Sequence, residues 1–324
     1  MDESGAAQAK TVALTKTERK SLMYRDFKRS TRLHWELYLL LLLPVALTII
    51  FQYVPMYGLQ IAFKDFRPAR GIWGSEWVGM RHFVRFVQTP SFIRVIGNTL
   101  RISLLAMIIG FPFPIILAVM LNEARVHWFK RTVQMATFAP YFISIVVVSG
   151  IVIQILDMRV GLVNHALAAM GLPRQNFMAR PTTFDPAFII SSIWQGTGFS
   201  SVIYLAALTA ISPELHEAAT ADGASRLRRL WHIDLPGIVP TITIILILNF
   251  GSIMGVSLER AMTLQNDINR SVGDVIGTFV FRVGIQQRNF SFTAAIGFAN
   301  SIVNLIMIVT VNQIARKIGE TSLW

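Results

Sequence analysis

The 324-residue chain contains no cysteine and few charged residues, since Asp, Glu, Lys and Arg together make up 15% of it. The lack of cysteine excludes disulfides and thiolate metal sites. The low charge accompanies 53% hydrophobic residues and a mean hydropathy of +0.52, which is too apolar for an ordinary water-soluble domain of this length. The composition therefore predicts a protein embedded in a lipid bilayer.

Motifs of ATP binding, metal binding and nucleophilic catalysis are also missing from the sequence. It contains no G-x-x-x-x-G-K-S/T loop, so ATP and Mg²⁺ would have to bind to another chain. The histidines show no metal-ligand spacing such as H-E-x-x-H. Ser191 and Ser192 have no nearby histidine or carboxylate to activate them. We therefore predict no catalytic residue, no metal ligand and no cofactor in this chain.

Six charge-free segments are long enough to cross about 30 Å of hydrocarbon, for which about 20 helical residues suffice. They extend over 37–57, 102–121, 132–156, 187–211, 235–258 and 290–315. Strand-like alternation is missing, and lipid-exposed backbone must satisfy its own hydrogen bonds. The sequence thus predicts an all-α membrane domain over 36–324. A shorter apolar run, 275–281, predicts a helix on the outer face.

Positive charge precedes the first segment, where residues 1–35 contain eight Lys and Arg side chains. By the positive-inside tendency this predicts a cytoplasmic N-terminus, and six spans then return the C-terminus to the cytoplasm. Residues 21–35 mix apolar and basic side chains, which suits an interfacial helix on an anionic leaflet, with a disordered basic tail as the alternative. We attribute the pI of 10.6 to contact with lipid and partner surfaces rather than with nucleic acid.

The most distinctive motif is a polar loop between the fourth and fifth apolar segments. It has the pattern E-A-A, three residues, G, nine residues, I-x-L-P, and begins at Glu217. Ser212 as N-cap and Pro213 at the first helical position predict a short helix that Gly223 can end. Apolar residues at helical spacing then predict a second short helix, and Pro236 predicts a restart of the helix that re-enters the membrane.

This loop resembles the cytoplasmic coupling loop of the membrane subunits of bacterial ATP-driven importers, which contacts a separate ATPase subunit. The similarity extends over nearly the whole chain. Residues 78–83, 98–100, 139–144 and 161–164 resemble carbohydrate-importer permeases of the maltose type. The stretches 290–297 and 318–324 are similar to a polysaccharide-permease subgroup, and most similar to its alginate-importer branch.

The resemblance implies the type I fold of ABC importer permeases, with coupling helices in the loop 212–236. Residues implied to couple to the ATPase are Glu217, Ala218, Ala219, Asp222, Gly223, Ala224, Arg228, Ile233, Leu235 and Pro236. The implied partners are a second related permease subunit, two cytosolic ATPase subunits that bind ATP and Mg²⁺, a periplasmic or extracellular solute-binding protein, a carbohydrate and membrane lipid. The implied location is the bacterial inner membrane, with both termini in the cytoplasm.

In such permeases the substrate passes between the fourth and fifth spans. Candidate residues on this path are Arg101, Tyr141, Ser144, Trp194, Gln195, Gly196, Phe199, Asn249, Ser252 and Asn300. Polar groups at membrane depth are costly unless they face protein or water. Gln195, Asn249, Asn300 and Asn304 therefore either line the path or join helices.

Basic residues crowd the first external segment, contrary to the positive-inside tendency. They are Lys64, Arg67, Arg70, Arg81, Arg85 and Arg94, with Arg101 at the threshold of the second span. A positive mouth would concentrate a polyanion, so we interpret the chain as part of an importer for an acidic oligo- or polysaccharide such as alginate. The alternatives are a solvated basic surface on an importer of a neutral oligosaccharide, a self-sufficient secondary transporter and a membrane-embedded transferase.

Overall fold

The structure is a computed structural model that describes residues 33–319 and 322–323. Most of the predicted interfacial helix over 21–35, and all eight basic residues before the first span, lie outside the described residues. The chain divides into two compact units, Met1–Gln60 and Ile61–Trp324.

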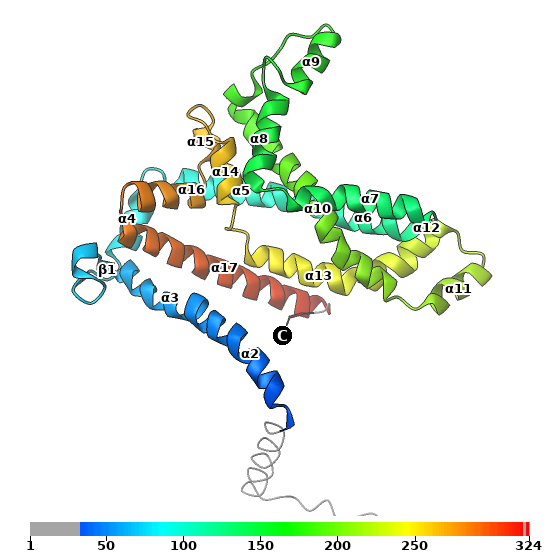
Figure 1. The fold of residues 1–324 in the computed structure, drawn as a ribbon, viewed down its shortest axis with the longest axis horizontal. Helices are drawn as coiled ribbons and strands as arrows, with labels where there is room; N and C mark the ends of the chain where they lie inside the picture. Colours follow the sequence, from blue (N-terminus) through cyan, green and yellow to red (C-terminus); the bar gives the residue numbers. More distant parts are fainter. Residues whose placement is uncertain (1–32, 320–321, 324) are drawn as a thin grey trace, which may run out of the picture. The chain divides into compact units, whose positions relative to one another are not determined.

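The first unit contains the helix of the first span (Figure 1). It begins with α2 (Trp35–Thr48) and continues through a π-helical turn (Ile49–Tyr53) and α3 (Val54–Met56). Pro44 inside α2 removes one backbone donor, and the Thr48 hydroxyl donates to the Pro44 carbonyl oxygen at 2.8 Å. α2 buries none of its residues, as expected of an apolar helix that faces lipid.

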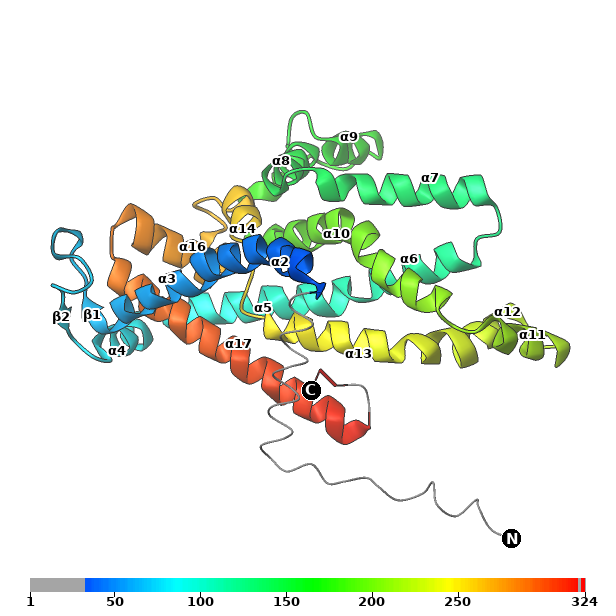
Figure 2. The same ribbon diagram turned by 60° about the horizontal axis from the view of Figure 1, so that its bottom comes forward.

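The second unit is almost entirely helical, and α10 lies at its centre. Its helices are α4 (Arg81–Gln88), α5 (Phe92–Gly110), α6 (Pro112–Glu123), α7 (His127–Phe138), α8 (Ile145–Leu156), α9 (Leu162–Ala169), α10 (Phe184–Thr209), α11 (Pro213–Ala221), α12 (Arg226–Arg229), α13 (Leu235–Gly251), α14 (Leu258–Leu264), α15 (Arg270–Gly273), α16 (Ile276–Val280) and α17 (Phe290–Ile318). α10 packs against α5, α6, α7 and α13, while α13 also packs along α17 (Figure 2). A small antiparallel pair joins β1 (Lys64–Asp65) to β2 (Glu76–Trp77).

Among the described residues, four helical segments are long and apolar enough to cross a membrane. They are Trp35–Phe63, Phe92–Glu123, Arg226–Gly251 and Phe290–Lys317. Two bent pairs also pass when each is counted as one span, namely His127–Phe142 with Ile145–Leu156 and Pro181–Thr209 with Pro213–Ala221. The structure is therefore compatible with the six predicted spans, by length and composition.

The third span is not the continuous helix predicted over 132–156. α7 ends in a 3₁₀ turn (Ala139–Phe142), and α8 begins at Ile145 after a bend of 102°. The turn contains Pro140, which cannot donate a backbone hydrogen bond, and Ile143 that follows it has an extended backbone with ψ of 138°. The side-chain amide of Gln195 donates to the Ile143 carbonyl oxygen at 2.7 Å and satisfies the acceptor that the break exposes.

The fifth span differs from the prediction at both ends. Its helix ends at Gly251 rather than near 258. At Gly251 the backbone approaches α17 so closely that an added Cβ would lie 2.8 Å from Ile308 Cδ1. At the other end the helix does not restart at Pro236, because α12, a π-helical turn (Leu230–Asp234) and α13 form one helix over Arg226–Gly251. A π turn breaks the regular hydrogen-bond ladder, so a proline that lacks an N–H is tolerated directly after it.

The segment between the fifth and sixth spans folds into α14, α15 and α16. A helix, α16, is present where 275–281 predicts one. Ile276 and Phe279 of α16 belong to a buried cluster with Phe86 and Phe292. The helix therefore packs into the core of this unit, and its place on the outer face of the membrane stays a prediction.

Candidate functional site

The first helix of the polar loop is built as the sequence predicts. The hydroxyl oxygen of Ser212 accepts a hydrogen bond from the backbone N–H of Glu214 at 3.3 Å, and Pro213 occupies the first turn of α11. Gly223 has a φ of +76°, in the left-handed region. The N–H of Ala224 then donates to the Ala219 carbonyl oxygen at 2.8 Å, which completes a glycine C-cap.

Contacts between residues far apart in the loop fasten its two halves together. The hydroxyl oxygen of Ser225 caps α12 by accepting from the N–H of Arg228 at 3.4 Å. Arg229 Nη1 donates to Thr220 Oγ1 at 2.6 Å, and His216 Nε2 lies 3.4 Å from the buried Asp234 Oδ1. No local motif in the sequence indicates these two pairs, because their members lie nine and 18 residues apart.

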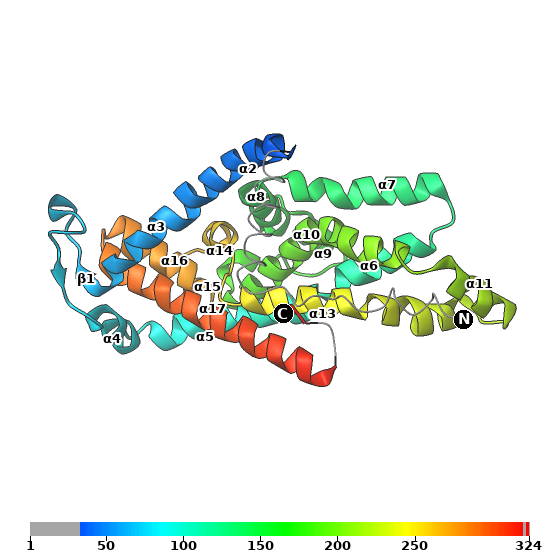
Figure 3. The same ribbon diagram turned by 90° about the horizontal axis from the view of Figure 1, so that it is seen from below.

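Six of the ten predicted coupling residues are exposed on this loop, and Ala219, Ala224, Ile233 and Leu235 are half-buried. Glu217, Ala218 and Ala219 lie on α11, Asp222, Gly223 and Ala224 in the turn, Arg228 on α12, Ile233 in the π turn, and Leu235 and Pro236 at the start of α13. Beside them Leu215, Leu227 and Trp231 are each more than half exposed. Figures 1 and 3 show α11 at one extremity of the second unit. Apolar side chains gathered at such an exposed end suit a protein partner, although contact with an ATPase stays a prediction.

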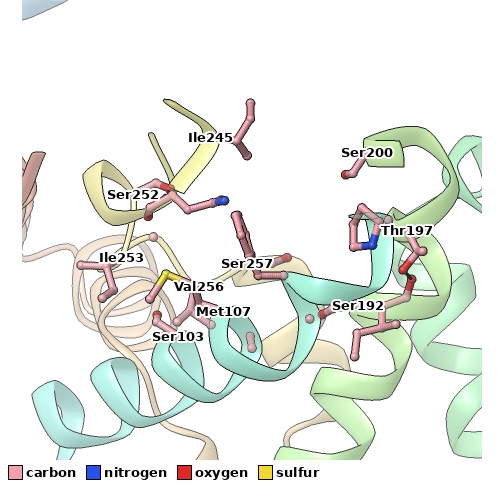
Figure 4. Close-up of a pocket in the computed structure, with 18 of the residues that line it drawn as sticks. Ser103, Met107, Ser192, Thr197, Ser200, Ile245, Ser252, Ile253, Val256 and Ser257 are labelled. Carbon is pink, nitrogen blue, oxygen red and sulfur yellow. Dashed lines mark hydrogen bonds between the residues drawn. The ribbon is translucent and has the colours of Figure 1, made fainter. Parts of the chain in front are cut away.

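A cavity of about 460 Å³ lies between α5, α6, α10 and the end of α13. Ser192, Thr197 and Ser200 of α10 line one side, and Ser252 and Ile253 line the opposite side (Figure 4). The hydroxyls of Ser192 and Thr197 donate to backbone carbonyls of their own helix, which leaves their oxygens as acceptors. The cavity is therefore mostly apolar with several neutral hydrogen-bonding groups, as expected of a small-molecule site.

Three of the predicted path residues line this cavity, namely Gly196, Asn249 and Ser252. The side chain of Gln195 lies behind the wall, where its Oε1 accepts from Arg260 at 2.6 Å. Arg260 itself lines the cavity, although the sequence analysis did not select it. It follows the fifth apolar segment without any motif, so only the tertiary fold shows where it lies.

The other predicted path residues lie outside the cavity lining. Arg101 forms an ion pair with Asp185 at 3.0 Å and donates to the Val272 carbonyl oxygen, so its guanidinium is engaged within the protein. Tyr141 stacks on Phe199 with ring centroids 3.9 Å apart. Trp194 is 45% exposed, Ser144 precedes α8, and Asn300 lies in α17. The role of each in a path stays a prediction.

Asn304 joins helices, which is one of the two roles considered for it. Its Oδ1 accepts from the backbone N–H of Met254 at 3.2 Å and so ties α17 to the segment after α13. Among the described residues, no group of three or more His, Asp and Glu side chains is placed to hold a metal ion.

Two of the stretches that resemble importer permeases, 98–100 and 161–164, contain asparagines that make hydrogen bonds within the fold. The Asn98 side-chain amide donates to the carbonyl oxygens of Ser271 and Asp274 and anchors the segment of α15 and α16 to α5. Asn164 donates to the Asp157 carbonyl oxygen at 3.0 Å.

The carboxyl group of Asp157 is ionised at neutral pH. Hydrogen bonds from the backbone N–H groups of Val160 and Arg159 lower its pKa.

The basic residues of the first external segment divide into two groups. Lys64 donates to the Ile72 carbonyl oxygen, Arg67 pairs with Asp65, and Arg85 lies 4.9 Å from the centre of the Phe292 ring. Arg70, Arg81 and Arg94 are exposed, as are Arg67 and Arg85. Five of the six basic side chains of this segment are thus exposed, and the positive mouth stays a prediction.

Comparison with known proteins gives near full-length matches. Residues 110–320 match the family described as binding-protein-dependent transport system inner membrane component. The polygalacturonan/rhamnogalacturonan transport system permease protein YteP of Bacillus subtilis (strain 168) is 38% identical over 322 residues, 99% of each chain. A chain in the crystal structure of a bacterial ABC transporter that imports the acidic polysaccharide alginate is 40% identical, with a TM-score of 0.81 over 91% of this chain and 99% of that chain.

The same likeness holds for a second solved structure, of the bacterial alginate ABC transporter in complex with its periplasmic protein bound to an alginate pentasaccharide. There the identity is 39% and the TM-score 0.82, with 93% of this chain and 99% of that chain covered. At this identity and coverage the likeness extends over most of the chain.

Proposed function

The chain belongs to the family of binding-protein-dependent transport system inner-membrane components, and we propose that it serves an importer of acidic oligo- or polysaccharides. It is a permease subunit of a carbohydrate ABC importer, in which the ATPase is a separate subunit. The observation that carries the proposal is its likeness, over almost the full length of each chain, to permeases named for polygalacturonan and for alginate. Both polymers consist largely of uronic acids.

The geometry supports a direct mechanical link between the loop and the cavity. α10 runs without a break from the cavity residue Gly196 to the start of the loop, over about 20 Å of helix. On the other side of the loop, the helix Arg226–Gly251 runs back to Asn249 at the cavity. A helix transmits displacement along its axis as a rigid body, so movement of the loop by ATPase closure would shift two walls of the cavity together.

The proposed assembly contains a second related permease, two cytosolic ATPase subunits and a solute-binding protein on the outer side. The polar loop would contact the ATPase, because it exposes apolar side chains at an extremity of the second unit. The binding protein would release the saccharide toward the exposed Arg70, Arg81 and Arg94. Support for the binding protein comes from the similar transporter that was solved with its periplasmic protein.

Substrate class is tested by ATP hydrolysis in the reconstituted transporter with its cognate binding protein. Tetragalacturonate and maltotetraose have equal length and differ in charge. We expect stimulation by the uronic acid oligomer and little by the neutral one. Equal or greater stimulation by maltotetraose would indicate a neutral-sugar importer and leave the family assignment unchanged.

Orientation is tested by single cysteines, since the chain has none of its own. Ser225→Cys and Lys317→Cys should react in sealed cells only with membrane-permeant reagents, and Glu76→Cys also with impermeant ones, because all three positions are exposed. Ser75 is unsuitable as an outer marker, since it is 6% exposed and donates its hydroxyl hydrogen to the Gly71 carbonyl oxygen. Labelling of Ser225→Cys by an impermeant reagent would contradict the proposed side of the loop.

A further inference from the structure

Arg260 is a buried cation at the wall of the cavity. It is 5% exposed and lies on α14. Its Nη1 donates to Ser191 Oγ at 2.8 Å, and its Nη2 donates to Gln195 Oε1 at 2.6 Å. The guanidinium also lies 5.7 Å from the centre of the Phe188 ring. These three residues of α10 fix the plane of the guanidinium.

The charge of Arg260 is not neutralised within the described part of the chain. Arg101 and Arg282 pair with Asp185 and Asp274, whereas Arg260 has no carboxylate within 4.0 Å among the described residues. Burial lowers the pKa of Arg260 to about 10, which leaves it protonated at neutral pH. A buried charge whose acceptors are all neutral is costly, so its retention calls for an anion that arrives from elsewhere.

The surroundings of Arg260 suit a carboxylate on a sugar. Among the described residues that line the cavity, Arg260 is the one charged side chain, and none is acidic. Ser192, Thr197, Asn249 and Ser252 supply neutral groups for sugar hydroxyls. Ser191 and Gln195 accept two of the five N–H donors of the guanidinium, so other donors remain for an incoming anion.

We propose that Arg260 binds a carboxylate of the saccharide inside the permease and so selects acidic substrates at the cavity. This inference deepens the proposed function and rests on it. Ser191 and Gln195 position the guanidinium, and the carboxylate accepts from it through charge-assisted hydrogen bonds. The selection would act after the binding protein has released the sugar, as a second and independent filter for charge.

The test measures equilibrium binding to the assembled, purified transporter without the binding protein, so that only the permease discriminates. The probes are radiolabelled tetragalacturonate and maltotetraose. We expect Arg260→Gln to weaken tetragalacturonate binding by at least about tenfold, the usual range for a lost bond to a charged group, and to leave maltotetraose binding unchanged. Arg131→Gln, which removes a charge from an exposed position outside the cavity lining, should change neither.

A second variant tests the charge while leaving Arg260 in place. Gln195→Glu sets a carboxylate against the guanidinium and also removes the Nε2 donor to the Ile143 carbonyl oxygen. It should weaken tetragalacturonate binding as Arg260→Gln does, and maltotetraose binding, measured beside it, reports any loss caused by the missing donor. It also keeps the proposal testable if Arg260→Gln fails to assemble.

The outcomes separate this inference from the proposed function. Equal losses for both sugars would mean that Arg260 only fastens α14 to α10, and would overturn the inference. Failure of the unaltered transporter to bind tetragalacturonate would overturn it as well. Neither result bears on whether tetragalacturonate stimulates ATP hydrolysis when the binding protein is present, which tests the proposed function.

Discussion

The polar loop and the cavity differ in how the sequence builds them. The loop is one continuous stretch, 212–236, whose helices are set by local N-caps and a glycine turn and whose side chains are mostly exposed. The cavity collects residues from Ile102 to Arg260, and its shape depends on how closely the helices behind it pack. Local chemistry thus determines the predicted docking surface, while tertiary packing determines the shape of the cavity.

The largest effect is expected where helix packing sets the cavity. Gly198 of α10 lies so close to α7 that a Cβ there would be 2.1 Å from the Thr137 carbonyl oxygen. Gly198→Ala should therefore force the helices apart and cost about 1–3 kcal/mol or more. The measurement is the thermal unfolding midpoint of the detergent-purified transporter.

Gly196→Ala is the matched control for that variant, because it lies two residues away on the same helix and a Cβ there meets no atom within 4 Å. Its unfolding midpoint should remain near that of the unaltered protein. If both variants unfold alike, close packing of α7 on α10 does not set the stability of the cavity wall.

A smaller effect, on activity rather than stability, is expected in the loop. Gly223→Val adds a β-branched side chain at a φ of +76°, at a local cost of about 1 kcal/mol or more, and Glu217→Lys reverses an exposed charge. Both variants should insert and assemble normally, yet lose most substrate-stimulated ATP hydrolysis. Gly171→Val, at a similar φ of +75° outside the loop, is the control and should transport normally. Full transport by Gly223→Val and Glu217→Lys would remove the loop from the coupling mechanism.

The features that the sequence predicted depend on local chemistry, as the polar loop does. Hydropathy located the apolar segments, because lipid imposes one composition on every span. Ser212, Pro213 and Gly223 were assigned correctly, because capping depends on neighbours within a few residues. The break at Ile143 and the early end at Gly251 were missed, because the first is held by a hydrogen bond from the distant Gln195 and the second lies where α17 leaves no room for a Cβ. Arg260 was missed because its partners, Ser191 and Gln195, lie more than 60 residues away in the sequence.

The smallest effect is expected at the outer mouth. Arg94 is exposed, so Arg94→Gln should slow uptake of tetragalacturonate by less than about tenfold at low ionic strength. The difference should vanish at about 1 M salt, where the screening length falls to about 3 Å. Initial uptake rates across a salt series measure it, with Arg125→Gln at the predicted inner side as control. A defect that persists at high salt would point to a structural role for Arg94.

The bend in the third span gives its two halves different neighbours. α7 packs against α10, which continues into the polar loop, whereas α8 packs chiefly against α14, which carries Arg260. The two halves meet at Ile143, whose carbonyl oxygen is held by Gln195. The third span is therefore bent between two sets of neighbours, and we expect a displacement of α10 to act mainly on its α7 half.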